Sequence, residues 1–518
     1  VCVLTKQAWI FLLSLVLLGA AACSAGPSQR PPVAYHDSGR QNPPAPQSEP
    51  EPVPDLGPPA EDLLGWEDCT EQTRRELGDL PAGMTFSCAQ LLSSLDTPED
   101  PLQGTVSNAL IKTGNGEVPL VVLGDITGEP GTTFAARMAT QLPPEVLDTF
   151  MIIGMDRRGT GESDPVNCVP QLERETITGF DPRATERAAL DQLLGSVRKA
   201  SQECLLTLDE RLTAYDTWRT ATDLEELRME LGVPRLHALA RGEASRVLTT
   251  YAERFPDKVG RMVLDGGLDP TRDALGHAEM QAQSAEQAFD VYAEDCVRRN
   301  CPLGPDPRGA VSDLIERVRS APLPAAGTQV QAGHVVRAVL AGLRDRNSWP
   351  ALTEALSAAR HGDGTGVAEL IAPEVNQRGV NPPLFDGDLV TSCNDTTLRV
   401  PPQRLTEIAG DWVNRFPVFG GLAVQRLTWC SLWPVPQQPL PELRQNGVPP
   451  IPVITTANDP LIPALGSDHL AAQLPTGVLL RWEGAGHGAV GRSSCITAAV
   501  SRFLVSAAVP TENMVCPG

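Results

Sequence analysis

One short stretch of the sequence has the pattern of a buried strand, a tight turn and a helix in direct succession. Residues 236–240 form a mostly apolar run, and apolar residues then recur at helical spacing until Pro256 ends the pattern. Gly242 lies at the turn, and the residues two positions before and after it, Ala240 and Ala244, are small. Small residues at these places let strand and helix pack closely, so the stretch predicts a strand–helix unit of a mainly parallel sheet.

The same layout surrounds the nucleophile of a large class of hydrolases. In a G-x-S-x-G turn, a strained backbone lifts a serine above the end of the sheet. This chain has Gly242 at the position of that serine. Glycine adopts the strained backbone at no steric cost, but it supplies no oxygen that could attack a carbonyl carbon. The sequence therefore predicts that the geometry of the turn is kept and that its nucleophile is absent.

Two further residues have the types and the order of a catalytic acid and base. Asp459 follows the apolar run 451–454, and His487 lies in a glycine-lined loop after the strand-like residues 478–482. The order nucleophile, acid, histidine is that of α/β hydrolases and differs from that of other triad proteases. Taken singly, an Asp before a proline or a His between glycines is more often a turn or loop residue. Together, they are expected to occupy the acid and base positions.

Four segments resemble one known family, the secreted actinobacterial tripeptidyl aminopeptidases; they are residues 151–163, 254–266, 456–460 and 486–495. These proteins are α/β hydrolases of the prolyl-aminopeptidase type with a carboxy-terminal domain that is typical of the family. The resemblance runs from about Trp66 to the end of the chain. It implies removal of residues from peptide amino termini, with serine as nucleophile, histidine as base and an acid that orients the histidine. Carried over by position, the serine falls on Gly242, the acid on Asp459 and the base on His487.

The resemblance also points to a change in the oxyanion hole. Relatives have a glycine-rich His/Asn-Gly-Gly-Pro-Gly loop, and residues 121–131 stand at its place with Glu129 where a glycine is expected. The second donor would be the N–H of Glu243, whose side chain is also acidic. A carboxylate near the oxyanion opposes the charge that the site stabilises. Glu129 and Glu243 are therefore expected to mark a remnant oxyanion hole that disfavours acyl transfer.

Three other routes to hydrolysis stay open at this point. Ser245 lies about one helical turn past the elbow, so its hydroxyl is expected to point away from the tip. Ser163 follows a Gly-Thr-Gly-Glu loop and has the pattern of a turn or cap residue. A water molecule activated by His487 could enter the space of the missing side chain, with turnover far below that of an intact triad.

The amino terminus predicts export. Lys6 precedes an apolar run, and small residues lead up to Cys23, as in a bacterial lipoprotein signal of residues 1–22 that is cleaved before a lipidated Cys23. A signal peptide with a fortuitous cysteine is the alternative. Residues 23–60 are rich in proline and polar residues, which predicts a disordered tether. We expect an extracellular, lipid-anchored protein on the cell-wall face of the membrane.

Cysteine usage agrees with an oxidising compartment. Of the 12 cysteines, Cys2 lies in the predicted signal and Cys23 at the lipidation site, which leaves an even number in the folded part. Sequence alone does not fix their connectivity, but the family resemblance suggests five short-range disulfides: Cys69–Cys88, Cys168–Cys204, Cys296–Cys301, Cys393–Cys430 and Cys495–Cys516. Metal binding is not expected, because no C-x-x-C pair or His cluster accompanies them, and no cofactor is expected.

The order of patterns predicts an α/β-hydrolase fold with helices on both faces of the sheet and an inserted helical cap. The core is expected over residues 61–271 and 447–518, with a TAP-like second part, and the cap over residues 272–446, where amphipathic helical stretches are broken by Pro and Gly.

A pseudo-hydrolase is the function that the sequence favours. The formal net charge of −22 excludes nucleic acid as a partner and leaves the lipid anchor as the route to the membrane. We expect a catalytically impaired member of the family that binds peptides or other cell-envelope ligands; the oligomeric state stays open. The alternative is an active hydrolase on peptide amino termini or small esters, working through His487 and Asp459 with water or an unrecognised nucleophile.

Overall fold

The computed structural model describes residues 51–518 apart from 59, 79, 98–100, 102–103, 326–327, 377–381, 437 and 445–446. The predicted signal peptide, the lipidation site Cys23 and most of the predicted tether lie outside these residues. Among the helices of the described residues, none is both long and apolar enough to cross a membrane.

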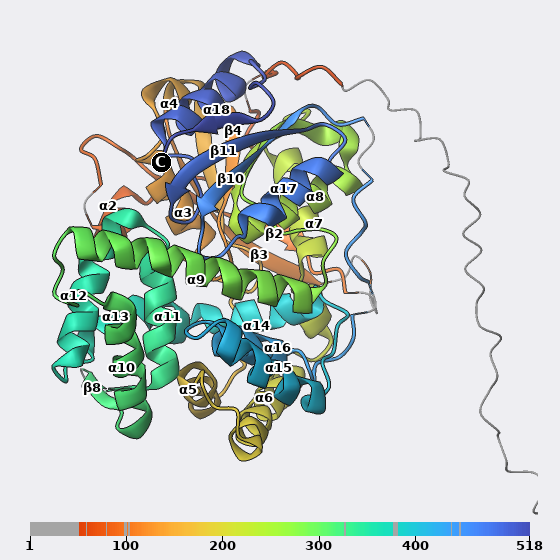
Figure 1. Ribbon diagram of the computed structural model, residues 1–518. Coiled ribbons are helices and arrows are strands. Elements are labelled where there is room, and N and C mark those ends of the chain that lie inside the picture. The colour runs from red at the N-terminus through yellow and green to blue at the C-terminus, as the bar shows by residue number, and fades with distance from the viewer. Residues whose placement is uncertain are drawn as a thin grey trace, which may run out of the picture. The chain divides into compact units, whose positions relative to one another are not determined.

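The described residues form one sheet of ten strands in the order β1-β2-β3-β5-β4-β6-β7-β10-β11-β12 (Figure 1). The pairs from β5 to β12 are parallel, and β1, β2 and β3 add an antiparallel edge. The strands are β1 Glu67–Asp68, β2 Ser87–Ser94, β3 Thr105–Thr113, β4 Val118–Leu123, β5 Phe150–Met155, β6 Leu236–Arg241, β7 Val259–Asp265, β10 Ile451–Asn458, β11 Gly477–Ala485 and β12 Met514–Cys516. The predicted α/β-hydrolase fold with a mainly parallel sheet is confirmed.

Helices cover both faces of this sheet, because its central strands are apolar on both sides. On one face, α7 (Thr217–Glu230), α8 (Ser245–Arg254) and α17 (Ala464–Gln473) enclose one apolar cluster with the strands. On the other, α3 (Gly131–Ala139), α4 (Pro144–Thr149) and α18 (Ser494–Ser506) enclose a second. Short helices α2 (Thr70–Leu77), η1 (Asp209–Ala214), η2 (Gly242–Ala244) and η3 (Pro256–Lys258) complete this part.

The helical cap lies beside the sheet, with α9 running along the boundary between them (Figure 1). Its elements are α9 Ala274–Arg298, α10 Pro307–Ser320, β8 Leu323–Ala325, β9 Thr328–Val330, α11 Ala332–Leu343, η4 Arg346–Ser348, α12 Trp349–Arg360, α13 Thr365–Val375, α14 Leu384–Asn394, α15 Pro402–Arg415 and α16 Gly420–Trp429. Two helices from outside the insertion, α5 (Gln171–Gly179) and α6 (Arg187–Leu208), pack against α11 and α16. The helical layer is therefore larger than residues 272–446 alone.

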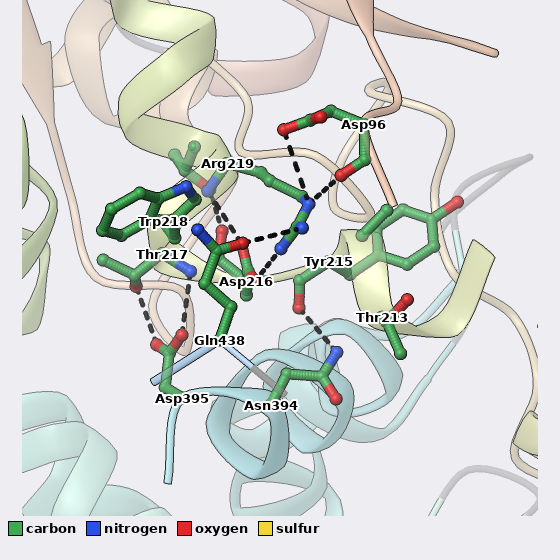
Figure 2. Close-up of polar contacts among 12 residues, drawn as sticks. Asp96, Thr213, Tyr215, Asp216, Thr217, Trp218, Arg219, Asn394, Asp395 and Gln438 are labelled. Atoms are coloured by element: carbon green, nitrogen blue, oxygen red, sulfur yellow. Dashed lines mark hydrogen bonds and ion pairs between the residues drawn. The ribbon is translucent and has the colours of Figure 1, made fainter. Parts of the chain in front are cut away.

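Polar contacts tie the cap to the first residue of α7 and to the loop before it (Figure 2). Asp395 accepts hydrogen bonds from the backbone N–H and hydroxyl of Thr217, at 2.8 and 2.7 Å. Asn394 donates to the Tyr215 carbonyl at 3.0 Å. In the core, Asp216 caps α7 by accepting from the Arg219 N–H at 2.7 Å. The bonds of Asp395 and Asn394 fix the end of α14 against the start of α7.

The predicted tether ends earlier than residue 60, because residues 51–58 lie on the core. Arg261 donates to the Pro54 carbonyl at 3.0 Å, and His237 Nε2 lies 3.2 Å from the Leu56 carbonyl. Val53 and Leu56 also pack against the apolar cluster of α3, α4 and α18. Two apolar side chains and the two bonded carbonyls thus fix a segment whose composition alone predicted disorder.

The five disulfides suggested by the family resemblance are the pairs formed in the structure: Cys69–Cys88, Cys168–Cys204, Cys296–Cys301, Cys393–Cys430 and Cys495–Cys516. The last joins α18 to the edge strand β12 across 21 residues.

Replacing Cys495 and Cys516 together by serine is expected to lower the free energy of unfolding by about 3 kcal/mol, because the unfolded chain then regains the freedom that the loop closure removed. Chemical denaturation of the oxidised protein measures this difference, with the exposed Glu512→Gln substitution as a control. A loss of under about 1 kcal/mol would contradict the expected role of this bridge.

Candidate functional site

The elbow predicted around Gly242 is present. Strand β6 is buried along its whole length and leads through the short turn η2 into α8. Gly242 has φ of 64°, in the left-handed region that disfavours other residues. The sequence thus keeps the strained backbone of a nucleophile elbow with a residue that fits it easily.

The structure brings Asp459 and His487 together at the carboxyl ends of neighbouring strands β10 and β11. The Nδ1 atom of His487 lies 3.1 and 3.0 Å from the two carboxylate oxygens of Asp459. Asp459 also accepts hydrogen bonds from the N–H groups of Leu461, Ile462 and Gly488. Both side chains are buried. This arrangement orients the imidazole so that Nε2 faces the elbow.

The carboxylate of a third side chain, Asp125, occupies the space beside Gly242 into which a side chain at the elbow tip would extend. It follows β4, the strand next to β6 in the sheet. Its Oδ1 accepts a hydrogen bond of 2.5 Å from the backbone N–H of Glu243, the residue after the elbow tip. Its Oδ2 forms an ion pair with His487 Nε2. One carboxylate thus binds both the backbone N–H of Glu243 and the imidazole of His487.

This arrangement of Asp125 and His487 requires a residue without a Cβ atom at position 242. A Cβ atom added to Gly242 would collide with Asp125 Oδ1 and would lie 2.5 Å from His487 Cε1 and 2.7 Å from Nε2. Contacts of this length do not occur for real Cβ atoms, so any other residue would displace Asp125, His487 or both. The glycine is therefore required by the carboxylate beside it as well as by the backbone.

The charges in this site stabilise one another. Burial alone would lower the pKa of His487, but the carboxylates of Asp125 and Asp459 outweigh burial and raise this pKa to about 9. Burial alone would raise the pKa of Asp125, but His487 above all holds it at about 2. At neutral pH, the site therefore contains an imidazolium ion between two carboxylates.

The carboxylate bonded to the Glu243 N–H is that of Asp125, a residue that sequence did not single out, whereas Glu129 and Glu243 were expected to mark a remnant oxyanion hole. Glu129 pairs with Arg137 at 2.9 Å, and Glu243 pairs with Arg157 at 2.6 Å. Each arginine draws its glutamate carboxylate into an ion pair of its own. The backbone N–H of Glu243 is the group that binds Asp125.

The two alternative serines use their hydroxyl groups elsewhere. Ser245 Oγ donates to the Gly266 carbonyl. Ser163 Oγ donates to the Asp156 carbonyl at 2.7 Å and accepts from the Ala109 N–H at 2.8 Å. Both side chains are buried and hold loops in place.

A cavity of about 720 Å³ lies between the elbow and the cap. Asp125, Glu243 and Arg246 line it from the core, and Arg344 and Asp395 from the cap side. His487 is not among its lining residues, but Asp125, whose carboxylate pairs with His487 Nε2, is. A ligand in this cavity can therefore contact Asp125. Among the described residues, no group of three or more His, Cys, Asp or Glu side chains is placed to hold a metal ion.

Sequence reasoning missed Asp125 because its importance depends on strand order. An acidic residue directly after a buried parallel strand was a usable signal, since ligands bind at the carboxyl edge of such sheets. Only the pairing of β4 with β6 brings that edge beside the elbow.

Titration of the His487 ring by NMR is expected to give a pKa near 9, falling towards the ordinary value in Asp125→Asn, because that substitution removes the largest charge effect raising it. The His487 contribution to folding stability is present below about pH 6.5 and is lost as pH rises through about 9. The Asp125 contribution is present above about pH 4 and is lost as pH falls through about 2. The stability difference between wild type and Asp125→Asn is thus largest from about pH 4 to 6.5. An ordinary His487 pKa in the wild type would contradict the ion pair.

Comparison with known proteins agrees with this fold. The model of the α/β hydrolase fold matches residues 126–314, and that of the TAP-like protein family matches residues 416–516. The chain is 27% identical over 500 residues to serine protease Hip1 of Mycobacterium tuberculosis, covering 89% of this chain and 92% of that protein. It is 26% identical over 412 residues to a tripeptidyl aminopeptidase of Streptomyces coelicolor, covering 75% and 74%.

Among solved structures, a thermophilic esterase from Thermogutta terrifontis is similar with a TM-score of 0.36 and 14% identity, covering 80% of this chain and 97% of that one. The chain is thus an α/β-hydrolase-fold protein with a TAP-like carboxy-terminal region, similar to tripeptidyl aminopeptidases.

Proposed function

We propose that this protein is a tripeptidyl aminopeptidase-like α/β hydrolase that has lost serine acyl transfer and binds a ligand, a peptide or another cell-envelope component, in the cavity beneath its cap. The observation that carries the proposal is the Asp125 carboxylate at the place of the nucleophile, bonded to the Glu243 N–H and paired with His487.

This carboxylate opposes each requirement of acyl transfer. The elbow tip carries no hydroxyl, because its residue is Gly242. The N–H that would stabilise an oxyanion already binds an anion, so negative charge developing beside it is repelled. The imidazole that would accept the serine proton is itself protonated, since its pKa is raised to about 9. Water activated by His487 is opposed for the same reasons.

The cavity supports a binding role. Its volume of about 720 Å³ is in the range of small-molecule sites. Its walls combine apolar side chains such as Ile126, Leu340 and Ile462 with charged groups of both signs. Relatives named as tripeptidyl aminopeptidases and a serine protease favour a peptide as the ligand.

Export and lipid anchoring are part of the proposal. They rest on the signal-like pattern before Cys23 and on the pairing of all ten cysteines of the described residues in disulfides, which is typical of oxidising compartments.

Expression in a host that processes lipoproteins is expected to yield a membrane-associated protein that begins at a diacylglyceryl-modified Cys23, as read by mass spectrometry of its first peptide. Cys23→Ala is expected to abolish the modification. An unmodified amino terminus upstream of residue 23 would refute the lipoprotein assignment.

Wild-type protein is expected to leave tripeptide and ester reporters uncleaved and to resist a serine-directed phosphonate. Gly242→Ser alone is expected to stay inactive and to unfold more easily, because its Cβ overlaps Asp125 and His487. In Gly242→Ser with Asp125→Ala, the Glu243 N–H and the His487 imidazole lose their carboxylate partner. Reporter cleavage and phosphonate labelling should therefore appear. Adding His487→Ala should abolish them.

These variants separate a blocked hydrolase site from a decayed one. Reporter cleavage by the wild type that is lost in His487→Ala would overturn the proposal. A silent double variant that is well folded by circular dichroism would show that more than the Asp125 carboxylate has been lost. Binding itself is tested by thermal stabilisation of the wild type with a tripeptide library, with Leu340→Trp as a variant that fills the cavity.

A further inference from the structure

We propose that Asp125 is itself a nucleophile, whose carboxylate opens an epoxide bound in the cavity and forms an ester that His487 and water then hydrolyse. This goes beyond the proposed binding role, although it uses the same cavity. In this proposal the Asp125 carboxylate, which pairs with His487, acts on a substrate without a serine and without a free oxyanion hole.

The first support is that Gly242 and Asp125 fit each other. A chain that had merely lost its serine could carry alanine at the elbow, but any Cβ there would collide with Asp125 Oδ1. The carboxylate is also held from two sides, by the Glu243 N–H at Oδ1 and by His487 at Oδ2. Each carboxylate oxygen has a second lone pair, and Asp125 lines the cavity. It is thus fixed and ionised, and a ligand can reach it.

The second support is the direction in which the site can stabilise charge. Attack on the carbonyl of an ester or peptide would create an oxyanion on the substrate, and the Glu243 N–H is not free to bind it. Attack on a saturated carbon creates no such oxyanion. When the resulting ester is hydrolysed, negative charge develops on Oδ1 of Asp125, where the Glu243 N–H already lies. The donor therefore suits an ester of Asp125.

The third support is the proton on His487. Its Nε2 faces Asp125 as an ion pair and, within the described part of the chain, makes no hydrogen bond of good geometry. A protonated Nε2 beside the nucleophile can donate to an oxygen that leaves a neighbouring carbon. A strained cyclic ether needs both a nucleophile and such an acid, which favours epoxides over other alkylating substrates.

The steps balance without another reactant. Oδ2 of Asp125 attacks an epoxide carbon, the ring C–O bond breaks, and the alkoxide takes the Nε2 proton, leaving an ester and a neutral imidazole. Water then attacks the ester carbonyl carbon and gives its proton to Nε2. Collapse of the tetrahedral intermediate breaks the acyl C–O bond, and the departing alkoxide takes that proton. The Asp125 acid finally protonates His487, which restores the ion pair and releases a vicinal diol.

The test uses the full chain and styrene oxide in water enriched in ¹⁸O. Wild-type protein is expected to form phenylethanediol and, over several turnovers, to gain ¹⁸O in the peptide that contains Asp125. Asp125→Ala should reduce the rate to background. Gly242→Ala should do the same with every carboxylate intact, because its Cβ displaces Asp125. The exposed Glu162→Ala is the control and should retain the wild-type rate.

A second probe traps the ester. Benzyl bromide loses bromide without a proton, so His487→Gln should still be alkylated at Asp125 but should not hydrolyse the ester, and the benzyl adduct should accumulate on that peptide. The adduct should be absent from Asp125→Ala/His487→Gln. Diol formation that survives Asp125→Ala, or the absence of ¹⁸O and of benzyl adduct on Asp125 with both probes, overturns the proposal. The binding role is judged separately, by the tripeptide reporters and thermal stabilisation.

Discussion

The contact between Asp125 and His487 determines what the rest of this site can do. Two carboxylates hold one imidazolium, and the backbone N–H of Glu243 holds the outer carboxylate in turn. Asp125 and His487 shift each other's pKa: His487 keeps Asp125 ionised, and Asp125 keeps His487 protonated. At neutral pH the site is therefore a buried cluster of three charged side chains, an imidazolium ion between two carboxylates.

Glycine at the elbow has two roles in this framework. Its positive φ preserves the turn between β6 and α8, and its missing side chain leaves room for a carboxylate from the neighbouring strand end. The glycine at position 242 and the position of the Asp125 carboxylate therefore depend on each other, because a Cβ atom at the elbow would overlap that carboxylate.

Much of this was predictable from local patterns, and the remainder depended on contacts between distant segments. The apolar runs predicted the strands, and the order of Gly242, Asp459 and His487 predicted their meeting, because each lies at a strand's carboxyl end. Asp125 was missed because strand order decides its neighbours. The ion pairs of Glu129 and Glu243 were not predicted, because their arginine partners lie 8 and 86 residues away in sequence and the latter pairing has no local signal.

The cap is bonded to the core at the site itself as well as at the loop before α7. Ser284 of α9 donates to the Asp459 carbonyl at 2.7 Å, and the His487 N–H donates to the Arg344 carbonyl at 2.7 Å. Together with the hydrogen bond from the Thr217 N–H to Asp395, these bonds join the cap to the core at three places around the cavity. Lifting the cap as a rigid body would break them together and would disturb Asp459 and His487. The cavity and the charged cluster are therefore held by the same contacts, so a change in the position of the cap would also change the geometry of the Asp459–His487 pair.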